Sequence, residues 1–267
     1  MKSFLAPLIR LLFCLSVRAD PPAYLEPYAK LLARHVDARG RVDYPALAAD
    51  PAPLRDIAVA LAGTDPNILA DATEAERFAF WINAYNALTL QLIVDHWPIA
   101  ATHTNAPPES IRQIPEAWSA PRFVVAGRQL SLDAIEHEIL RKEIGNPLLH
   151  FGLVCASRGC PPLPHEPFRA ADVIPRLQAQ ARAFLASPEN LRYDEETKTL
   201  FLSPIFDWFR EDFAGPYGKP LAKGFDQASS GLLHFARTYG PESLRSKMAE
   251  ARAIRFLDYD WRLNRQP

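Results

Sequence analysis

The sequence predicts a single helix-rich α+β domain in which a central buried helix packs on a small, mainly antiparallel sheet. Apolar residues cover nearly every side of the helix expected at residues 78–95, which is typical of a buried helix. Two pairs of short extended segments, at 122–132 and 191–202, flank turn residues as β-hairpins do. No repeat or linker divides the chain, and 48% hydrophobic residues in a chain of 267 allow one large core.

The first 19 residues have the pattern of an export signal. Lys2 and Arg10 form a basic start, residues 11–17 are apolar, and a small residue, Ala19, ends the segment. A run this short cannot cross a membrane, which requires roughly 20 apolar residues. We therefore expect a signal peptide at 1–19 and a mature domain at 20–267. That domain would be periplasmic or secreted, and it would lack an integral membrane segment.

The charge balance limits the class of partner. The formal net charge is −1 and no basic patch is visible in the sequence, which argues against a nucleic-acid partner. We expect no cofactor, and the partner expected is an unidentified small molecule or peptide.

Hydrophobic periodicity predicts the helices and strands, and proline and glycine mark where they end. Thr73 and Glu76 form a predicted capping box before the central helix, and Ser131 is a predicted cap of the helix at 132–142. The apolar run 150–154 predicts a buried strand. The other expected helices are 24–36, the part of 47–61 beyond Pro53, 173–185, 205–213 and 229–239, and a last strand is expected at 254–257.

Two asparagines lie within the apolar central helix. A buried amide without partners costs about 1–3 kcal/mol, so Asn83 and Asn86 must each bond to a specific group. They either fix a neighbouring loop, or one of them orients a catalytic imidazole or polarises a substrate carbonyl.

Two titratable residues stand out in the helix at 132–142. Glu136 falls within its apolar arc and His137 at the edge of that arc. A carboxylate on the core side needs a partner or a raised pKa. Glu136 is therefore either part of a structural ion pair or a partner in catalysis.

Cys155 and Cys160 enclose a short loop after the apolar run, and three interpretations are open. They could form a disulfide in an oxidising compartment. Cys155 could be a nucleophile with His137 or His150 as its base. They could bind a metal, but their spacing to His165 is not a usual zinc pattern, and we expect no metal site.

The sequence resembles the domain-of-unknown-function family numbered 547. The segments that resemble it are 40–44, 80–88, 130–137, 150–161, 205–208 and 258–264. Gly159 departs from the serine that the family usually has before its second cysteine. The resemblance implies no established reaction.

Two functions follow as expectations. The first is a thiol-dependent hydrolase or acyl transferase. Its catalytic set would be Cys155, His137, Glu136, Asn83 and Asn86, and its binding set His150, Ser157, Arg158 and Cys160. The alternative is a non-catalytic binding or interaction module with a Cys155–Cys160 disulfide.

Overall fold

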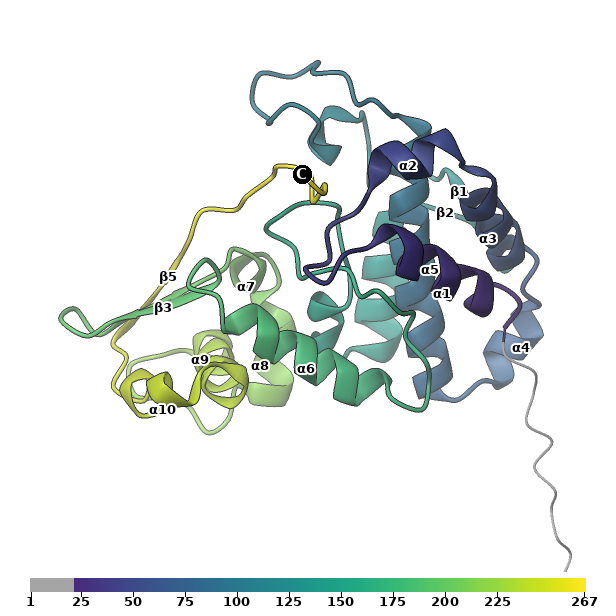
Figure 1. The fold of residues 1–267 in the computed structure, drawn as a ribbon. Coiled ribbons are helices and arrows are strands. Elements are labelled where there is room, and N and C mark those ends of the chain that lie inside the picture. Colours follow the sequence, from purple (N-terminus) through teal and green to yellow (C-terminus); the bar gives the residue numbers. More distant parts are fainter. Residues whose placement is uncertain (1–21) are drawn as a thin grey trace, which may run out of the picture.

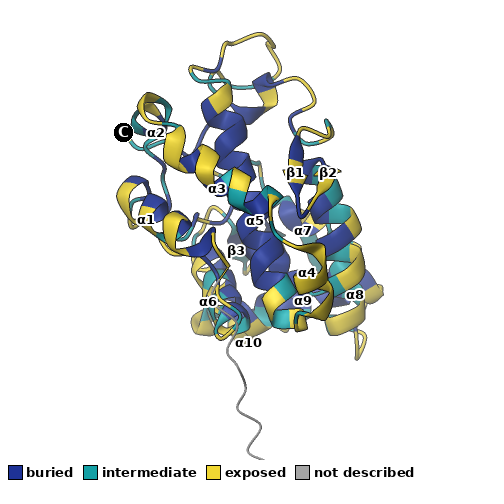
Figure 2. Cartoon of the chain, turned by 90° about the vertical axis from the view of Figure 1, so that its right-hand side faces the viewer, coloured by how far each residue is buried: buried dark blue, intermediate teal, exposed yellow. Residues whose placement is uncertain are grey.

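Helix α5 (Glu74–Asp95) runs through the middle of the fold (Figure 1). The computed structural model describes residues 22–267, so the predicted signal peptide lies outside the described residues. Thr73 and Glu76 form the predicted capping box at the start of α5. Every residue from Phe78 to Val94 is buried, which confirms the central buried helix (Figure 2).

Short helices from the N-terminal half of the chain pack around α5. Helices α2 and α3 pack against it directly, and α1 packs on α3. The antiparallel hairpin of β1 and β2 pairs Phe123 with Leu130 and contacts α3. The elements of this half are α1 (Leu25–His35), α2 (Tyr44–Ala49), α3 (Ala52–Ala62), α4 (Pro66–Asp71), the 3-10 helix η1 (Ile111–Gln113), β1 (Phe123–Val125) and β2 (Arg128–Leu130).

The second half adds a helical group and a three-stranded sheet. The sheet order is β3-β4-β5, with β3 and β4 antiparallel and β4 and β5 parallel. These elements are the π-helix η2 (Ala134–Ile144), the 3-10 helix η3 (Pro147–Phe151), α6 (Val173–Leu185), β3 (Leu191–Asp194), β4 (Thr199–Leu202), α7 (Ile205–Trp208), α8 (Arg210–Tyr217), α9 (Gln227–Tyr239), α10 (Glu242–Met248) and β5 (Ala253–Phe256).

This arrangement confirms the helix-rich α+β class, and it adds a detail about the core. The main neighbours of α5 are the helices α2, α3, α6 and η2, rather than a sheet. The three-stranded sheet lies to the side, where its strands extend away from α5 (Figure 1).

Three predicted elements differ from the structure. The strand predicted at 150–154 is wrong: Pro147 begins a 3-10 helix, η3, and the Asn146 side chain accepts a hydrogen bond from the Leu148 backbone amide. A short apolar run suits a buried helical turn as well as a strand, so periodicity alone could not decide. The helix predicted at 132–142 is a π-helix that ends at Gly145, and the helix predicted at 205–213 breaks at Phe209 into α7 and α8.

None of the helices in residues 22–267 combines the length and the apolar character that a membrane span requires.

Candidate functional site

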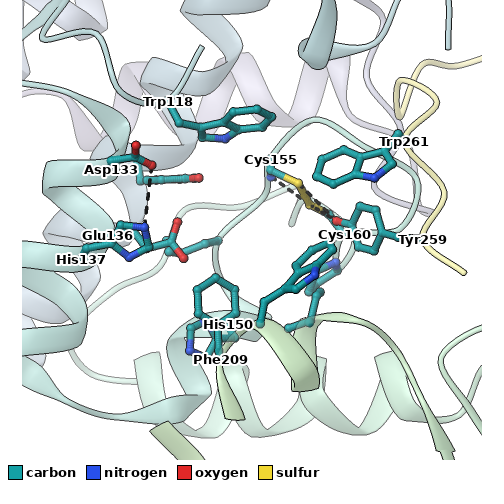
Figure 3. Close-up of a pocket in the computed structure, with 15 residues that line it drawn as sticks. Trp118, Asp133, Glu136, His137, His150, Cys155, Cys160, Phe209, Tyr259 and Trp261 are labelled. Carbon is teal, nitrogen blue, oxygen red and sulfur yellow. Dashed lines mark hydrogen bonds and ion pairs between the residues drawn. A yellow bond between two sulfur atoms is a disulfide. The ribbon is translucent and has the colours of Figure 1, made fainter. Parts of the chain in front are cut away.

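The loop from Cys155 to Cys160 forms one wall of a pocket. Its two sulfur atoms lie at disulfide distance, with the Cα atoms 6.3 Å apart (Figure 3). The Cys155 backbone amide donates to the Cys160 sulfur at 3.0 Å. Ala156 has a left-handed backbone with φ of 59°, which is unusual for a residue with a side chain. The loop therefore holds a costly turn, and the surrounding structure must stabilise it.

The C-terminal segment 258–264 provides that stabilisation. The amides of Arg158 and Gly159 donate to the carbonyls of Arg262 and Asp260 at 2.8 and 2.9 Å. The Asn264 amide donates to the Ala156 carbonyl at 3.1 Å. The last residues of the chain thus hold the loop in place.

The same segment brings Tyr259 against both sulfur atoms. The Ser157 hydroxyl donates to the Tyr259 hydroxyl at 2.9 Å, and the Tyr259 hydroxyl donates to the Cys160 sulfur at 3.2 Å. The Cys155 sulfur lies 3.3 Å from this hydroxyl. Burial raises the pKa of Tyr259 well above its usual value, so the phenol keeps its proton.

The ring of Tyr259 lies directly over Gly159. A Cβ atom on Gly159 would lie 2.8 Å from the ring, closer than carbon atoms normally approach. Glycine at this position therefore allows the ring to pack on the loop. A side chain at this position would displace the ring.

Opposite the loop, η2 and the segment 205–209 complete a pocket of about 210 Å³ (Figure 3). Its lining is mainly aromatic. The lining residues are Tyr85, Trp118, Asp133, Glu136, His137, His150, Leu153, Cys155, Cys160, Pro161, Ile205, Trp208, Phe209, Tyr259 and Trp261.

Glu136 projects from η2 into this pocket. The residue is only 8% exposed, and burial raises the pKa of its carboxyl to about 7. The Tyr85 hydroxyl and the charge of Arg141 both lower this pKa, but they do not offset the effect of burial. A fraction of the Glu136 carboxyls is therefore protonated at neutral pH.

His137, one residue further along η2, is held by its own helix. Its Nδ1 lies 3.1 Å from a guanidinium nitrogen of Arg141, and its Nε2 lies 3.8 Å from the Asp133 carboxylate. A guanidinium group can only donate, so Nδ1 accepts and the ring proton is on Nε2. The side chain is 39% exposed.

His150 belongs to a second, more deeply buried network. Its Nε2 lies 2.8 Å from Asp212, which also receives two hydrogen bonds from Arg141 at 2.7 and 2.8 Å. Its ring stacks on Phe209 with centroids 4.1 Å apart. Burial lowers the pKa of His150, although Asp212 opposes this, and the imidazole is therefore neutral at pH 7. Burial also opposes ionisation of Asp212, but its bonds to His150 and Arg141 keep its pKa below the usual value.

Asn83 and Asn86 lie in the core, away from the lining of the pocket. Each side-chain amide donates one hydrogen bond to a backbone carbonyl and accepts one from a backbone amide. Asn83 donates to the Phe168 carbonyl at 2.8 Å and accepts from the Phe168 amide at 2.9 Å. Asn86 donates to the Gly152 carbonyl at 2.8 Å and accepts from the Val154 amide at 2.9 Å. These bonds correspond to the first of the two predicted roles, which is to fix neighbouring loops.

The structure thus brings some of the predicted site residues together and separates others. Five of them line the pocket: Glu136, His137, His150, Cys155 and Cys160. Ser157 lies behind the two sulfurs, where its hydroxyl lies 3.2 Å from the Cys155 sulfur, and Arg158 is exposed.

Sequence reasoning missed the aromatic residues of the pocket. Trp208, Tyr259 and Trp261 pack on one another with ring centroids 4.5–5.6 Å apart, and Trp118 meets Trp261 at 6.1 Å. A signal was present, because segments 205–208 and 258–264 are among those that resemble the family. Only the fold reveals that they meet at the cysteine loop.

Among the described residues, no group of three or more His, Cys, Asp and Glu side chains is arranged to hold a metal ion.

The fold and the pocket define a helix-rich α+β domain built around an aromatic site next to a cysteine pair. Residues 69–185 match the model of the family described as "Protein of unknown function, DUF547", which confirms the resemblance predicted from the sequence. The match contains α5, η2, the cysteine loop and α6. No curated protein and no solved structure matches the chain.

Proposed function

We propose that this chain is an exported small-molecule-binding module in which a Cys155–Cys160 disulfide forms part of the pocket wall. One observation carries the proposal: the two sulfurs lie at disulfide distance on the wall of an aromatic pocket. A bridged cysteine has no thiolate and cannot act as a nucleophile. The aromatic lining remains, and aromatic side chains with a few polar groups are typical of ligand sites.

The hydrogen bonds of the sulfurs favour the same proposal. Both sulfurs contact the hydroxyls of Ser157 and Tyr259, and neither has an imidazole partner within residues 22–267. The Nδ1 atom of His137 is already occupied by Arg141. A nucleophilic cysteine requires a base within hydrogen-bond reach, and His137 would have to leave Arg141 to bond through Nδ1.

A thiol-dependent hydrolase or acyl transferase is the second candidate. It is favoured by the presence of Cys155, His137 and Glu136 on the wall of one pocket. In that case the cysteines would be reduced in the native protein, with His137 turned towards Cys155.

Export is part of the proposal and is supported by the pattern of residues 1–19. An oxidising compartment would also maintain the disulfide. The expected result is a mature protein that begins at Asp20, measured by intact mass after recovery from the envelope fraction. A retained Met1 or a cytoplasmic location would contradict export.

The binding function is tested by titrating the purified chain with small molecules of different classes while following tryptophan fluorescence. Trp118, Trp208 and Trp261 line the pocket, so a ligand there should change the emission. Trp208→Ala should weaken binding by about tenfold or more, because this ring is part of the wall. Trp97→Phe is the matched control: Trp97 stacks on Tyr44 and is not part of the pocket lining. A screen in which no class binds would refute the binding function.

A further inference from the structure

The pocket contains a buried carboxyl group that forms no salt bridge among residues 22–267. Glu136 is 8% exposed, and its carboxyl points into the pocket (Figure 3). The nearby guanidinium group of Arg141 forms its salt bridge with Asp212 instead, at 2.7 Å. In the described part of the chain, no lysine or arginine lines the pocket. A charged carboxylate in this position needs a counter-ion, and none of residues 22–267 forms a salt bridge with it.

Carboxyl groups are the charged groups on the lining of the pocket within residues 22–267. Asp133 is a second carboxylate on its wall. His150, which is buried against Phe209 and bonded to Asp212, is neutral and adds no positive charge. Two guanidinium groups contact rings of the lining, Arg141 at 5.0 Å from Phe209 and Arg112 at 5.1 Å from Trp261, but neither arginine lines the pocket itself. An anionic ligand would meet the two carboxyl groups on the lining.

Aromatic rings form most of the remaining wall. Trp208, Tyr259 and Trp261 form a contiguous cluster beside the cysteine loop, and Phe209 and Trp118 belong to the same lining. The π-face of an aromatic ring carries partial negative charge and attracts organic cations. Several rings together with a buried carboxylate that forms no salt bridge within residues 22–267 are the combination that recognises alkylammonium groups.

The size of the pocket limits the ligand. Its volume of about 210 Å³ is below the roughly 300–1,000 Å³ of sites for drug-sized molecules. A compound of a few heavy atoms, or one end group of a longer molecule, would fill it.

We propose that the pocket binds a small organic cation, with an alkylammonium group held between the aromatic cluster and the carboxylate of Glu136. This inference rests on the proposed binding function and specifies its ligand class. The cation would supply the counter-ion that the buried carboxyl lacks, and the rings would replace the water around its methyl or methylene groups.

The test compares choline with its neutral isostere, 3,3-dimethyl-1-butanol, by calorimetric titration of the full chain. We expect choline to bind at least tenfold more tightly. Glu136→Gln should reduce this ratio to near one, because the amide keeps the shape and removes the charge. Glu136→Asp, which keeps the charge, should retain a preference for choline. Glu138→Gln is the matched control, since Glu138 lies on the same helix, is exposed and pairs with Lys142.

The outcomes separate this inference from the binding function. If the neutral alcohol binds as tightly as choline, or if Glu136→Gln leaves the ratio unchanged, the cation inference fails. If choline does not bind but a neutral sugar or a carboxylate binds in a Trp208-dependent manner, the inference fails and the binding function survives. If no compound binds in that screen, both fail.

Discussion

Replacing Glu136 by glutamine should change how the stability of the protein depends on pH. Burial raises the pKa of this carboxyl from its ordinary value of 4.5 to about 7. The folded protein therefore binds the proton more tightly than the unfolded chain does. The stability that the protonated carboxyl provides is fully present below pH 4.5 and is lost as the pH rises through 7.

The size of the effect follows from this shift. A rise from 4.5 to about 7 corresponds to a total of about 3 kcal/mol, of which about 2.5 kcal/mol falls between pH 5 and pH 8. Glutamine occupies the same space, can accept a hydrogen bond from Tyr85 and does not ionise. The stability of Glu136→Gln relative to the wild type should therefore rise by about 2.5 kcal/mol over this interval.

Urea unfolding of both proteins at pH 5, 6, 7 and 8 measures this difference. Other groups that titrate in this interval are common to both proteins and cancel in the comparison. Glu138→Gln should follow the wild type, because Glu138 is exposed. Parallel curves for Glu136→Gln and the wild type would show that the carboxyl is not held in a desolvated site, and the description of the pocket would be wrong.

Four further substitutions test the framework of the site. Asn83→Ala and Asn86→Ala should each lower the free energy of unfolding by about 1–3 kcal/mol, because backbone groups lose their partners, and losses below about 0.5 kcal/mol in urea melts would contradict this. Asp212→Asn should cost about 2–3 kcal/mol through its lost charge-assisted bonds, and a thermal melt like that of the wild type would refute it. Gly159→Ala should cost about 1–3 kcal/mol and alter the near-ultraviolet spectrum as Tyr259 moves, and an unchanged spectrum would refute the close packing.

Much of the fold could be predicted because local patterns determined it. The apolar residues of α5 and the capping box at Thr73 specify a buried helix and its start. Turn residues specify both hairpins, which the structure confirms at 123–130 and 191–202. Ser131 accepts from the Ala134 amide at 3.0 Å, as predicted for a cap.

The errors have a common physical origin. The mainly apolar run 150–154 would be buried as a strand or as a helical turn. Pro147 and the Asn146 cap favour the helical turn. Helix η2 packs against α5, and its π-helical winding is not encoded in hydrophobic periodicity. Local sequence therefore predicted burial here, but not the conformation.

The candidate site was predictable only in part for a similar reason. Glu136 and Cys155 stood out as unusual residues in apolar surroundings, and both line the pocket. Tyr259 meets Cys155 across about a hundred residues of sequence, and Trp261 lines the same pocket. Backbone bonds that no local pattern encodes bring them there. The asparagines were recognised as buried, but their partners in loops at 152–154 and 168 were not predictable.

The redox state of Cys155 and Cys160 in the native protein tests the central claim most directly. Protein recovered from the envelope would be treated with iodoacetamide before and after reduction, and its intact mass would be measured. The binding module predicts that neither cysteine is labelled until a reductant is added, and that both are labelled afterwards. A native protein that is labelled rapidly at Cys155, with a thiol pKa below about 8.5 that rises in His137→Ala, would contradict it and favour the hydrolase.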